Sequence, residues 1–438
     1  MGSLRSGNEN LGEAMNLTDE QRKILNGSQG EIMAKVMETM MRYGELFGAD
    51  SMVEITGKYN HLVTSFGLKG IAAVYELMDK LIEAGISSSQ KFSMDPRPLD
   101  PNVPSNFLQD FVFKKIMYTR QDSYEKQLKK LGALSDDAYT CTCYMDEVGN
   151  VPKEGDVLSW AESSAVVYAN SVLGARCNRN SGIIDLMGSI LGYVPKFGLI
   201  TDEGRKAKWI VEIKTKKKPE AQLLGSAIGM KVMEDVPYII GLDKWLKELD
   251  DDAKTYLKDF GAATASNGSV GLYHIENLTP EAKKQGRDLI NKDAKVYVID
   301  DAELKRVYDN YPIMWKKTNA KPKMCFMGCP HMSISQLKDW AKKIDPALKE
   351  NNLKKVTIPT VFTAAPQVLD KFRGTEEFEI LDNAGVILSY ICPLMYMNNP
   401  LCARMPVITS SNKLRTYTTA RYYTDEEILK QITGGNKL

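Results

Sequence analysis

The sequence predicts a multi-lobed α/β protein whose largely parallel sheets are flanked by helices. Short apolar runs alternate along the chain with segments of helix length, and this alternation is typical of βα units. The expected strands are 139–144, 210–213, 236–240, 270–274, 296–299, 323–326, 356–359, 386–391 and 407–409. A length of 438 residues allows two or three such lobes, and the sequence leaves their boundaries open.

Sequence patterns typical of helices predict several helices outside these strands. Thr18 and Gln21 have the spacing of a capping box, which predicts the start of a helix. Apolar residues at 32, 36 and 40 predict a second helix with one buried face. A further capping box is expected at Ser159 and Glu162. Residues 1–16, with Gly-Ser and Gly-Asn pairs, are expected to form a mobile leader or a cloning remnant, and 17–438 the folded region.

The composition excludes several classes of protein. Charged residues are spread along the chain and the formal net charge is +1, so the basic face of a nucleic-acid-binding protein is missing. The sequence has neither an apolar stretch long enough to span a membrane nor a secretory signal. Seven cysteines, an odd number, favour reduced thiols or metal ligands over a disulfide framework. We therefore expect a cytoplasmic protein.

The stretch 324–333 places Cys325, Cys329 and His331 close together in a chain with three histidines. Thiolates bind iron, zinc and copper(I) in preference to hard cations, so the stretch suggests a metal or redox site. Cys141 and Cys392 also stand at the ends of expected strands, and three such thiols can meet at one place and hold an iron-sulfur cluster with one iron open. Packed thiols and a structural zinc site are the alternatives.

The segment 174–182 is a candidate anion clamp. It contains Arg176 and Arg179 between glycines that let the backbone come close to a ligand. Two guanidinium groups in such a loop suit a carboxylate or phosphate. A surface loop with two solvated arginines is the alternative.

An ordered set of short motifs links the chain to a known family. They are 17–20 with 25–27, His61, Cys141 with Thr142, 160–166, 168–176 with 178–179, 279–282, 328–333, Cys392 and 411–413. Through these motifs, over about 17–435, the chain resembles the catalytic large subunit of the aconitase X family, dehydratases related to aconitase.

The resemblance implies an aconitase-like catalytic unit without the swivelling domain. It implies an iron-sulfur cluster, 4Fe-4S or 2Fe-2S, bound by Cys141, Cys329 and Cys392, and a small partner subunit that carries the swivelling domain and a serine base. His331 is the best placed histidine because it is near Cys329. Catalytic candidates are His61, His331, Lys413 and Ser411, and substrate-binding candidates are Arg176, Arg179, Asn170, Ser171 and His274.

The expected reaction removes water from a small hydroxy acid, cis-3-hydroxy-L-proline or a related compound, with the metal as Lewis acid. Phosphomevalonate is the alternative substrate within the family. A non-catalytic relative that senses iron or binds RNA is the alternative of another class, although the near-neutral charge counts against RNA.

Overall fold

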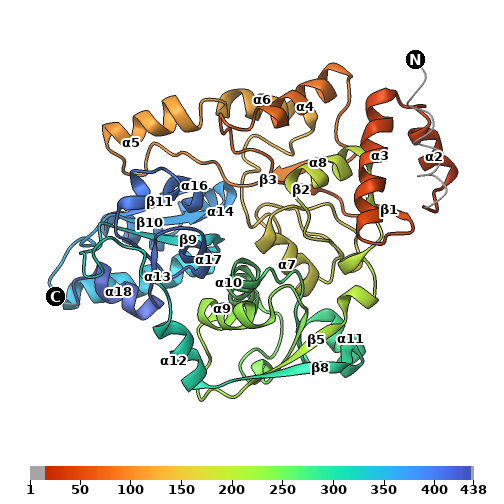
Figure 1. Cartoon of the computed structure of the whole chain (residues 1–438). Helices are drawn as coiled ribbons and strands as arrows, with labels where there is room; N and C mark the ends of the chain where they lie inside the picture. Colours follow the sequence, from red (N-terminus) through yellow and green to blue (C-terminus); the bar gives the residue numbers. More distant parts are fainter. Residues whose placement is uncertain (1–14, 436–438) are drawn as a thin grey trace.

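The computed structural model describes residues 15–435, and its two larger sheets are parallel (Figure 1). One sheet has the strand order β7-β6-β5-β8, with β5 at Ala207–Ile213, β6 at Pro237–Ile240, β7 at His274–Ile275 and β8 at Ile290–Ile299. The other has the order β11-β10-β9-β12-β13, with β9 at Met324–Met332, β10 at Thr360–Ala364, β11 at Val386–Ser389, β12 at Val407–Thr409 and β13 at Arg421–Tyr422. This architecture confirms the α/β prediction.

The N-terminal part is a group of helices around two small sheets. β1 (Met52–Glu54) pairs antiparallel with β4 (Tyr193–Pro195), and β2 (Asn60–Leu62) pairs parallel with β3 (Phe92–Met94). The helices are α2 (Asp19–Leu25), α3 (Glu31–Leu46), α4 (Ala72–Glu83), α6 (Gln121–Leu131) and α8 (Gly182–Leu191). The capping box of Thr18 and Gln21 is present at the start of α2. The apolar stripe of α3 is buried in a core shared with α4, α6 and α8.

Helix α10 (Asp251–Gly268) lies near the centre of the molecule (Figure 1). It packs against α7 (Ser163–Ser171), α9 (Ala221–Val232) and α17 (Asn412–Tyr417). Its contact with α9 is close because glycines face each other. A Cβ atom added to Gly268 would lie 1.8 Å from the carbonyl oxygen of Gly229, so a larger residue does not fit there.

The other helices cover the sheets or connect the strands. They are α5 (Phe107–Phe111), which continues as the π-helix η1 (Val112–Met117), α11 (Pro280–Gln285), α12 (Asp301–Asp309), α13 (Ile334–Glu350), α14 (Pro366–Phe372), α15 (Glu376–Asn383), α16 (Pro393–Met397) and α18 (Asp425–Ile432). Short 3-10 turns are η2 (Gly198–Ile200), η3 (Glu203–Arg205), η4 (Leu242–Lys244), η5 (Gly286–Leu289) and η6 (Cys402–Arg404). Within 15–435, each helix is too short or too polar to bridge a lipid bilayer.

Four predicted strands need correction. The strand expected at 270–274 begins only at its last residue, because β7 is His274–Ile275. The strand expected at 356–359 lies at Thr360–Ala364, just after it. The segment 139–144 is irregular and makes only one bridge, from Tyr139 to Met94. The strand expected at 323–326 is longer than predicted, because β9 continues to Met332 and contains Cys329. The thiol of Cys329 therefore belongs to a strand rather than to the loop that follows one.

Two boundaries predicted from the sequence, the start of α7 and the end of the leader, also differ from the structure. Glu162, not Ser159, is the N-cap of α7, because its carboxylate accepts a hydrogen bond from the Ala165 amide. The predicted leader is wrong at its end, since Met15 is buried and the Asn16 amide donates to the Asp50 carbonyl at 2.7 Å. Positions 1–14 of that leader lie outside the described residues.

Candidate active site

Three cysteines from distant parts of the chain line one cavity of about 440 Å³. Cys141 lies in the irregular segment, Cys329 in β9 and Cys392 at the N-cap of α16. All three are buried and free of disulfide bonds. The structure therefore brings together the three thiols that the sequence singled out.

His331 connects the segments that carry these thiols. Its Nε2 donates to the carbonyl of Ile391 at 3.1 Å, and Thr140 Oγ1 lies 2.9 Å from its Nδ1. Because a carbonyl only accepts, Nε2 carries the proton and Nδ1 accepts from the hydroxyl. The main-chain amide of His331 is 3.4 Å from the sulfur of Cys141. Thr140 precedes Cys141 and Ile391 precedes Cys392, so one residue of β9 holds both other segments.

The imidazole of His331 is neutral in this setting. It is completely buried, and burial lowers its pKa to about 4. Both ring nitrogens are used in hydrogen bonds to neighbouring segments. His331 lines the cavity, but its ring is engaged in holding the site rather than in carrying a proton to a substrate.

A buried ion pair between Lys413 and Glu162 forms another wall of the cavity. Lys413 comes from α17 and Glu162 caps α7, so the packing of both helices against α10 brings them together. Burial would lower the pKa of the Lys413 ammonium, but Glu162 raises it well above the usual value. Burial likewise acts to raise the pKa of Glu162, and Lys413 lowers it. Both groups are therefore charged.

His61 and Asp95 form a second polar pair beside the cavity. His61 lies in β2, and its Nε2 is 3.4 Å from Asp95 Oδ1, while its Nδ1 is 2.9 Å from Ser93 Oγ. Burial acts to lower the pKa of His61, but the Cys143 sulfur and the Asp95 carboxylate raise it to about 10. Asp95 lines the cavity, so the charge of His61 acts on the site through this carboxylate.

The hydroxyl of Ser411 makes two hydrogen bonds to the main chain at this site. Its hydroxyl donates to the carbonyl of Cys329 and accepts from the Leu414 amide at 3.1 Å, which caps α17. A hydroxyl with both bonds made is poorly suited to proton transfer. Ser411 therefore fixes the backbone at Cys329 and the start of the helix that carries Lys413.

The donor chemistry of the three thiols fits an iron-sulfur cluster. Burial raises the pKa of each thiol, that of Cys329 to about 11, and Lys413 opposes this rise. Such thiols stay protonated unless a thiophilic metal replaces the proton. Within 15–435, no three His, Cys, Asp or Glu side chains are close enough to hold one metal ion. Thiolates are the protein ligands of iron-sulfur clusters, so three buried thiols at one cavity have the donor chemistry that a cluster requires.

The other cysteines take part in packing. Cys325 and Cys402 are completely buried in hydrophobic cores. Cys177 contacts the carbonyl of Trp160 at 3.6 Å, and Cys143 is buried next to His61. Cys325 therefore stands apart from Cys329, although the two are close in sequence.

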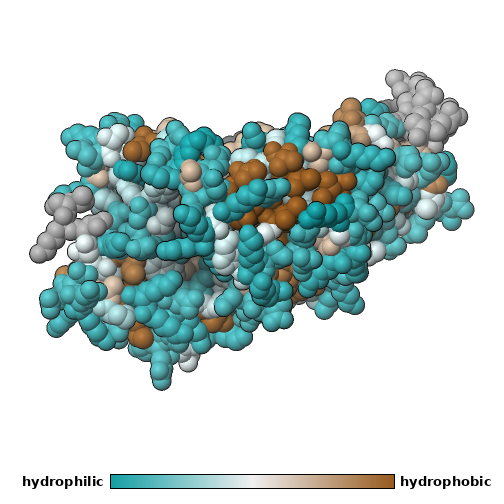
Figure 2. All heavy atoms as spheres, turned by 90° about the horizontal axis from the view of Figure 1, so that it is seen from below, coloured by the Kyte–Doolittle hydropathy of each residue, from teal (hydrophilic) through white to brown (hydrophobic). Residues whose placement is uncertain are grey.

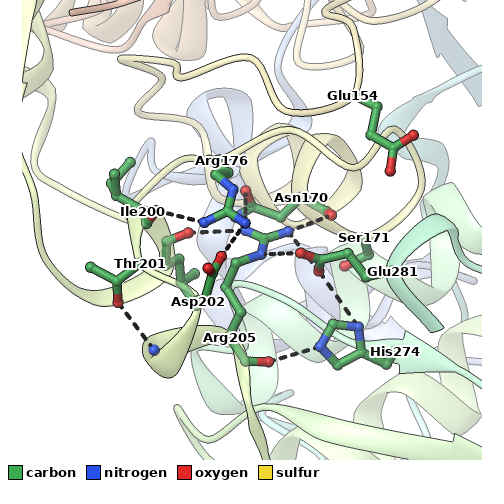
Figure 3. Close-up of polar contacts among 12 residues, drawn as sticks. Glu154, Asn170, Ser171, Arg176, Ile200, Thr201, Asp202, Arg205, His274 and Glu281 are labelled. Carbon is green, nitrogen blue, oxygen red and sulfur yellow. Dashed lines mark hydrogen bonds and ion pairs between the residues drawn. The ribbon is translucent and has the colours of Figure 1, made fainter. Parts of the chain in front are cut away.

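Four predicted substrate-binding residues belong to a different network, built around Arg205 (Figure 3). Arg205 is buried and makes two hydrogen bonds to Glu281, at 2.7 and 2.9 Å. His274 donates from Nε2 to the Arg205 carbonyl at 2.8 Å, and its Nδ1 is 3.7 Å from Glu281. Arg176 donates to the Ile200 carbonyl at 2.9 Å and pairs with Asp202.

Asn170 and Ser171 complete this network with bonds to the main chain. The Asn170 amide group donates to the carbonyls of Cys177 and Gly271, both at 2.8 Å, and its oxygen accepts from the Cys177 amide. Ser171 Oγ accepts from the Tyr273 amide at 2.9 Å. None of these residues lines the thiol cavity. The role of Asn170, Ser171, Arg176 and His274 in substrate binding stays a prediction, and in the structure their polar groups bond to other parts of the chain.

Arg179 is the exception within the predicted clamp. It is half-buried, and its Nη1 is buried without a hydrogen-bond partner among residues 15–435. Burial lowers the pKa of this guanidinium, while the phenol of Tyr417, which lines the thiol cavity, acts to raise it. A buried cationic donor with an open position is suited to an anionic group of a ligand.

Sequence reasoning missed Asp95 and Glu162, two carboxylates of the cavity. Asp95 lies in a proline-rich stretch that the sequence indicates only as irregular. Glu162 lies inside the 160–166 motif, one of the ordered motifs that link the chain to the family. That position was the one sequence feature that could have marked it as a site residue. Carboxylates are numerous in this chain, 56 in all, so their burial decides which of them matter.

The fold and the cavity define a class of protein, an α/β enzyme whose parallel sheets bring thiols and a buried lysine–carboxylate pair to one site. The chain belongs to the aconitase X family, since residues 14–203 match the aconitase X first domain and residues 207–309 the second domain. It is accordingly a hydro-lyase, like the family's named dehydratases, as the sequence predicted.

Similar proteins carry two kinds of dehydratase name. The chain is 33% identical to the phosphomevalonate dehydratase large subunit of Thermococcus kodakarensis, over 81% of this chain and 82% of that one. It is 29% identical to the cis-3-hydroxy-L-proline dehydratase of Hypocrea jecorina, over 75% of this chain but 53% of that longer protein. The crystal structure of Thermococcus kodakaraensis aconitase X in its holo-form matches with a TM-score of 0.77 and 29% identity, over 95% of this chain and all of that one.

Proposed function

We propose that this chain is the large subunit of a dehydratase that uses an iron-sulfur cluster to remove water from a small hydroxy acid. The observation that carries the proposal is the meeting of Cys141, Cys329 and Cys392 in one cavity beside Lys413 and Glu162. Thiol ligands next to buried charged groups are suited to metal-assisted elimination of a hydroxyl.

The three cysteines would hold the cluster, of the 4Fe-4S or 2Fe-2S type. When bound, the cluster supplies a Lewis acid for the leaving hydroxyl. The residues of the chain bind and orient the substrate. Lys413, held by Glu162, places a positive charge where the carboxylate of the substrate gains charge during α-proton removal. Arg179 offers its open guanidinium position to a further anionic group.

Phosphomevalonate is the substrate that we propose to test first. Two phosphomevalonate dehydratase large subunits match this chain over about four fifths of their length. A match over most of the length is expected if this chain is also such a large subunit. A substrate with a carboxylate and a phosphate needs two cationic positions. Lys413 in the cavity is one, and Arg179, which is outside the cavity lining, is our candidate for the other.

cis-3-Hydroxy-L-proline is the second candidate, favoured by a different observation. Asp95 and Glu162 both line the cavity, and Lys413 is the one cation among the described lining residues. A ring ammonium would find an acceptor in Asp95, whereas a dianionic phosphate would be repelled by it. This substrate is also the one expected from the sequence, and the choice between the two stays a prediction.

The proposal includes a small partner subunit that supplies the base for α-proton removal. Several relatives are named large subunits, and the cis-3-hydroxy-L-proline dehydratases are much longer than the matched region. The test is anaerobic co-expression of the chain with the small subunit from the same organism, followed by turnover assays with both substrates. We expect turnover of one substrate by the pair and little by the lone chain. Full activity of the lone chain would refute the need for the partner, and a pair inactive on both substrates would refute the proposed substrates.

A further inference from the structure

Helix α5 and the π-helix η1 present an apolar surface to solvent. Phe107, Leu108, Phe111 and Ile116 are 81%, 62%, 51% and 50% exposed. Gln109 and Phe113, one turn apart, face inward, so the exposed side chains share the outer side of this helical segment. Soluble proteins seldom leave a cluster of large apolar side chains in water unless another surface covers it.

This segment and the residues on both sides of it are attached to one wall of the thiol cavity. Tyr118 Oη donates to the carbonyl of Met395 at 2.9 Å, and Tyr396 Oη donates to the Pro104 carbonyl at 2.6 Å. Asn399 Nδ2 donates to the Gln109 carbonyl at 3.3 Å. These contacts lead to helix α16 and the residues after it, and Leu394, Met395 and Asn398 line the cavity.

The segment is attached to a second wall as well. The Lys69 amide donates to the Met117 carbonyl at 2.8 Å, and the Arg120 amide donates to the Gly67 carbonyl at 3.2 Å. Phe66, next to Gly67, lines the same cavity. The inner side of the segment is therefore fixed to two walls of the cavity, and the apolar surface forms its outer side.

We propose that the outer side of α5 and η1 is the docking surface for the small subunit. This inference rests on the proposed function, in which the small subunit supplies the base. A partner that delivers the base must approach the cavity, and the α5–η1 segment, apolar on its outer side, is attached by hydrogen bonds to two of the cavity walls. The surface suits a small globular domain with an apolar patch of its own. The cis-3-hydroxy-L-proline dehydratases have room for such a domain in the length that lies beyond the matched region.

A second exposed apolar patch provides a matched control. It lies over β5 and β8 on the face seen from below (Figure 2), and β8 exposes Val296 and Val298 by 58% and 42%. Figure 1 shows β8 and α5 at opposite ends of the molecule. Substitutions at β8 remove exposed apolar side chains without touching the proposed surface.

The test compares Phe107→Ser/Phe111→Ser with Val296→Ser/Val298→Ser in the full chain. Affinity for the purified small subunit is measured by biolayer interferometry, and thermal melting checks that both variants fold. Exposed aromatic side chains at the centre of an interface are hot spots, so we expect the first variant to bind about thirtyfold more weakly or worse. The control should stay within about threefold of the wild type.

Three results would overturn the docking surface. They are unchanged binding by the Phe variant, weaker binding by the Val variant, and a lone chain that is a dimer and becomes a monomer in the Phe variant. Turnover by the wild-type pair separates this inference from the proposed function. An inactive pair whose binding depends on Phe107 and Phe111 supports the surface and refutes the reaction, whereas an active pair with unchanged binding refutes the surface alone.

Discussion

Asp185 is a buried carboxyl whose ionisation should control how the stability of the chain depends on pH. It lies on α8, and its Oδ1 accepts from Ser159 Oγ at 3.0 Å and from Asn180 Nδ2 at 3.2 Å. Its Oδ2 is buried and has no partner among residues 15–435. Burial raises the pKa of this carboxyl to about 8, although the two hydrogen bonds act to lower it.

The perturbation is Asp185→Asn, which keeps an acceptor at the Oδ1 position and removes the charge. Since the pKa is raised on folding from about 3.9, the stability that the neutral carboxyl contributes is complete below about pH 4 and is lost as the pH rises to about 8. Each pKa unit corresponds to about 1.4 kcal/mol. Between about pH 5.5 and pH 8, the wild type should lose about 3 kcal/mol of unfolding free energy that the variant keeps.

Urea unfolding of both proteins at these two pH values measures the difference. Subtracting the unfolding free energy of the wild type from that of the variant removes the contribution of all other groups that titrate in both chains. Asp339→Asn is the control, because Asp339 is an exposed carboxylate on α13 and its loss should leave the pH dependence as in the wild type. Parallel pH dependence in the Asp185 variant and the wild type would refute the reasoning, since Asp185 would then titrate alike in the folded and unfolded chain.

Three further predictions concern the cavity. Cys329→Ala should abolish the visible iron-sulfur absorption after anaerobic reconstitution, while Cys402→Ala, in a hydrophobic core, should keep it; a cluster in the Cys329 variant would contradict the ligand assignment. Glu162→Gln leaves the buried Lys413 ammonium without its charged partner and should lower the unfolding free energy by about 3–5 kcal/mol in urea titrations; a loss below about 1 kcal/mol would argue against the pair. Arg179→Ala should raise KM about tenfold or more with a smaller change in kcat, because it removes a binding contact; a fall in kcat alone would contradict this role.

The parallel sheets could be predicted from sequence because their strands are continuous apolar runs between helical segments. β5, β6 and β12 appear near the expected places for this reason. The segment 139–144 has the composition of a strand but lacks neighbours to pair with. Its backbone is held instead by side chains, as in the bond between Thr140 and His331. Strand propensity reports packing against neighbours, which depends on tertiary structure.

The site was predictable where residue types are rare. Seven cysteines and three histidines leave few combinations, and the three cysteines chosen line one cavity. The polar candidates Asn170 and Arg176 bond to other parts of the chain in the structure, and no local sequence pattern distinguishes such bonds from ligand contacts. Glu162 gains its importance from a lysine 251 positions away in sequence. Such long-range pairs become visible only when the fold is known.

The bonds of His331 have a consequence for the lifetime of the site. They join β9 to the residues before Cys141 and Cys392 through protein groups alone, so the spacing of the thiol segments does not depend on a bound metal. If the three thiols hold the proposed cluster, a chain built in this way would lose it to oxidants and accept a new one without refolding. Damage and repair of the cofactor would then be separate from the turnover of the polypeptide.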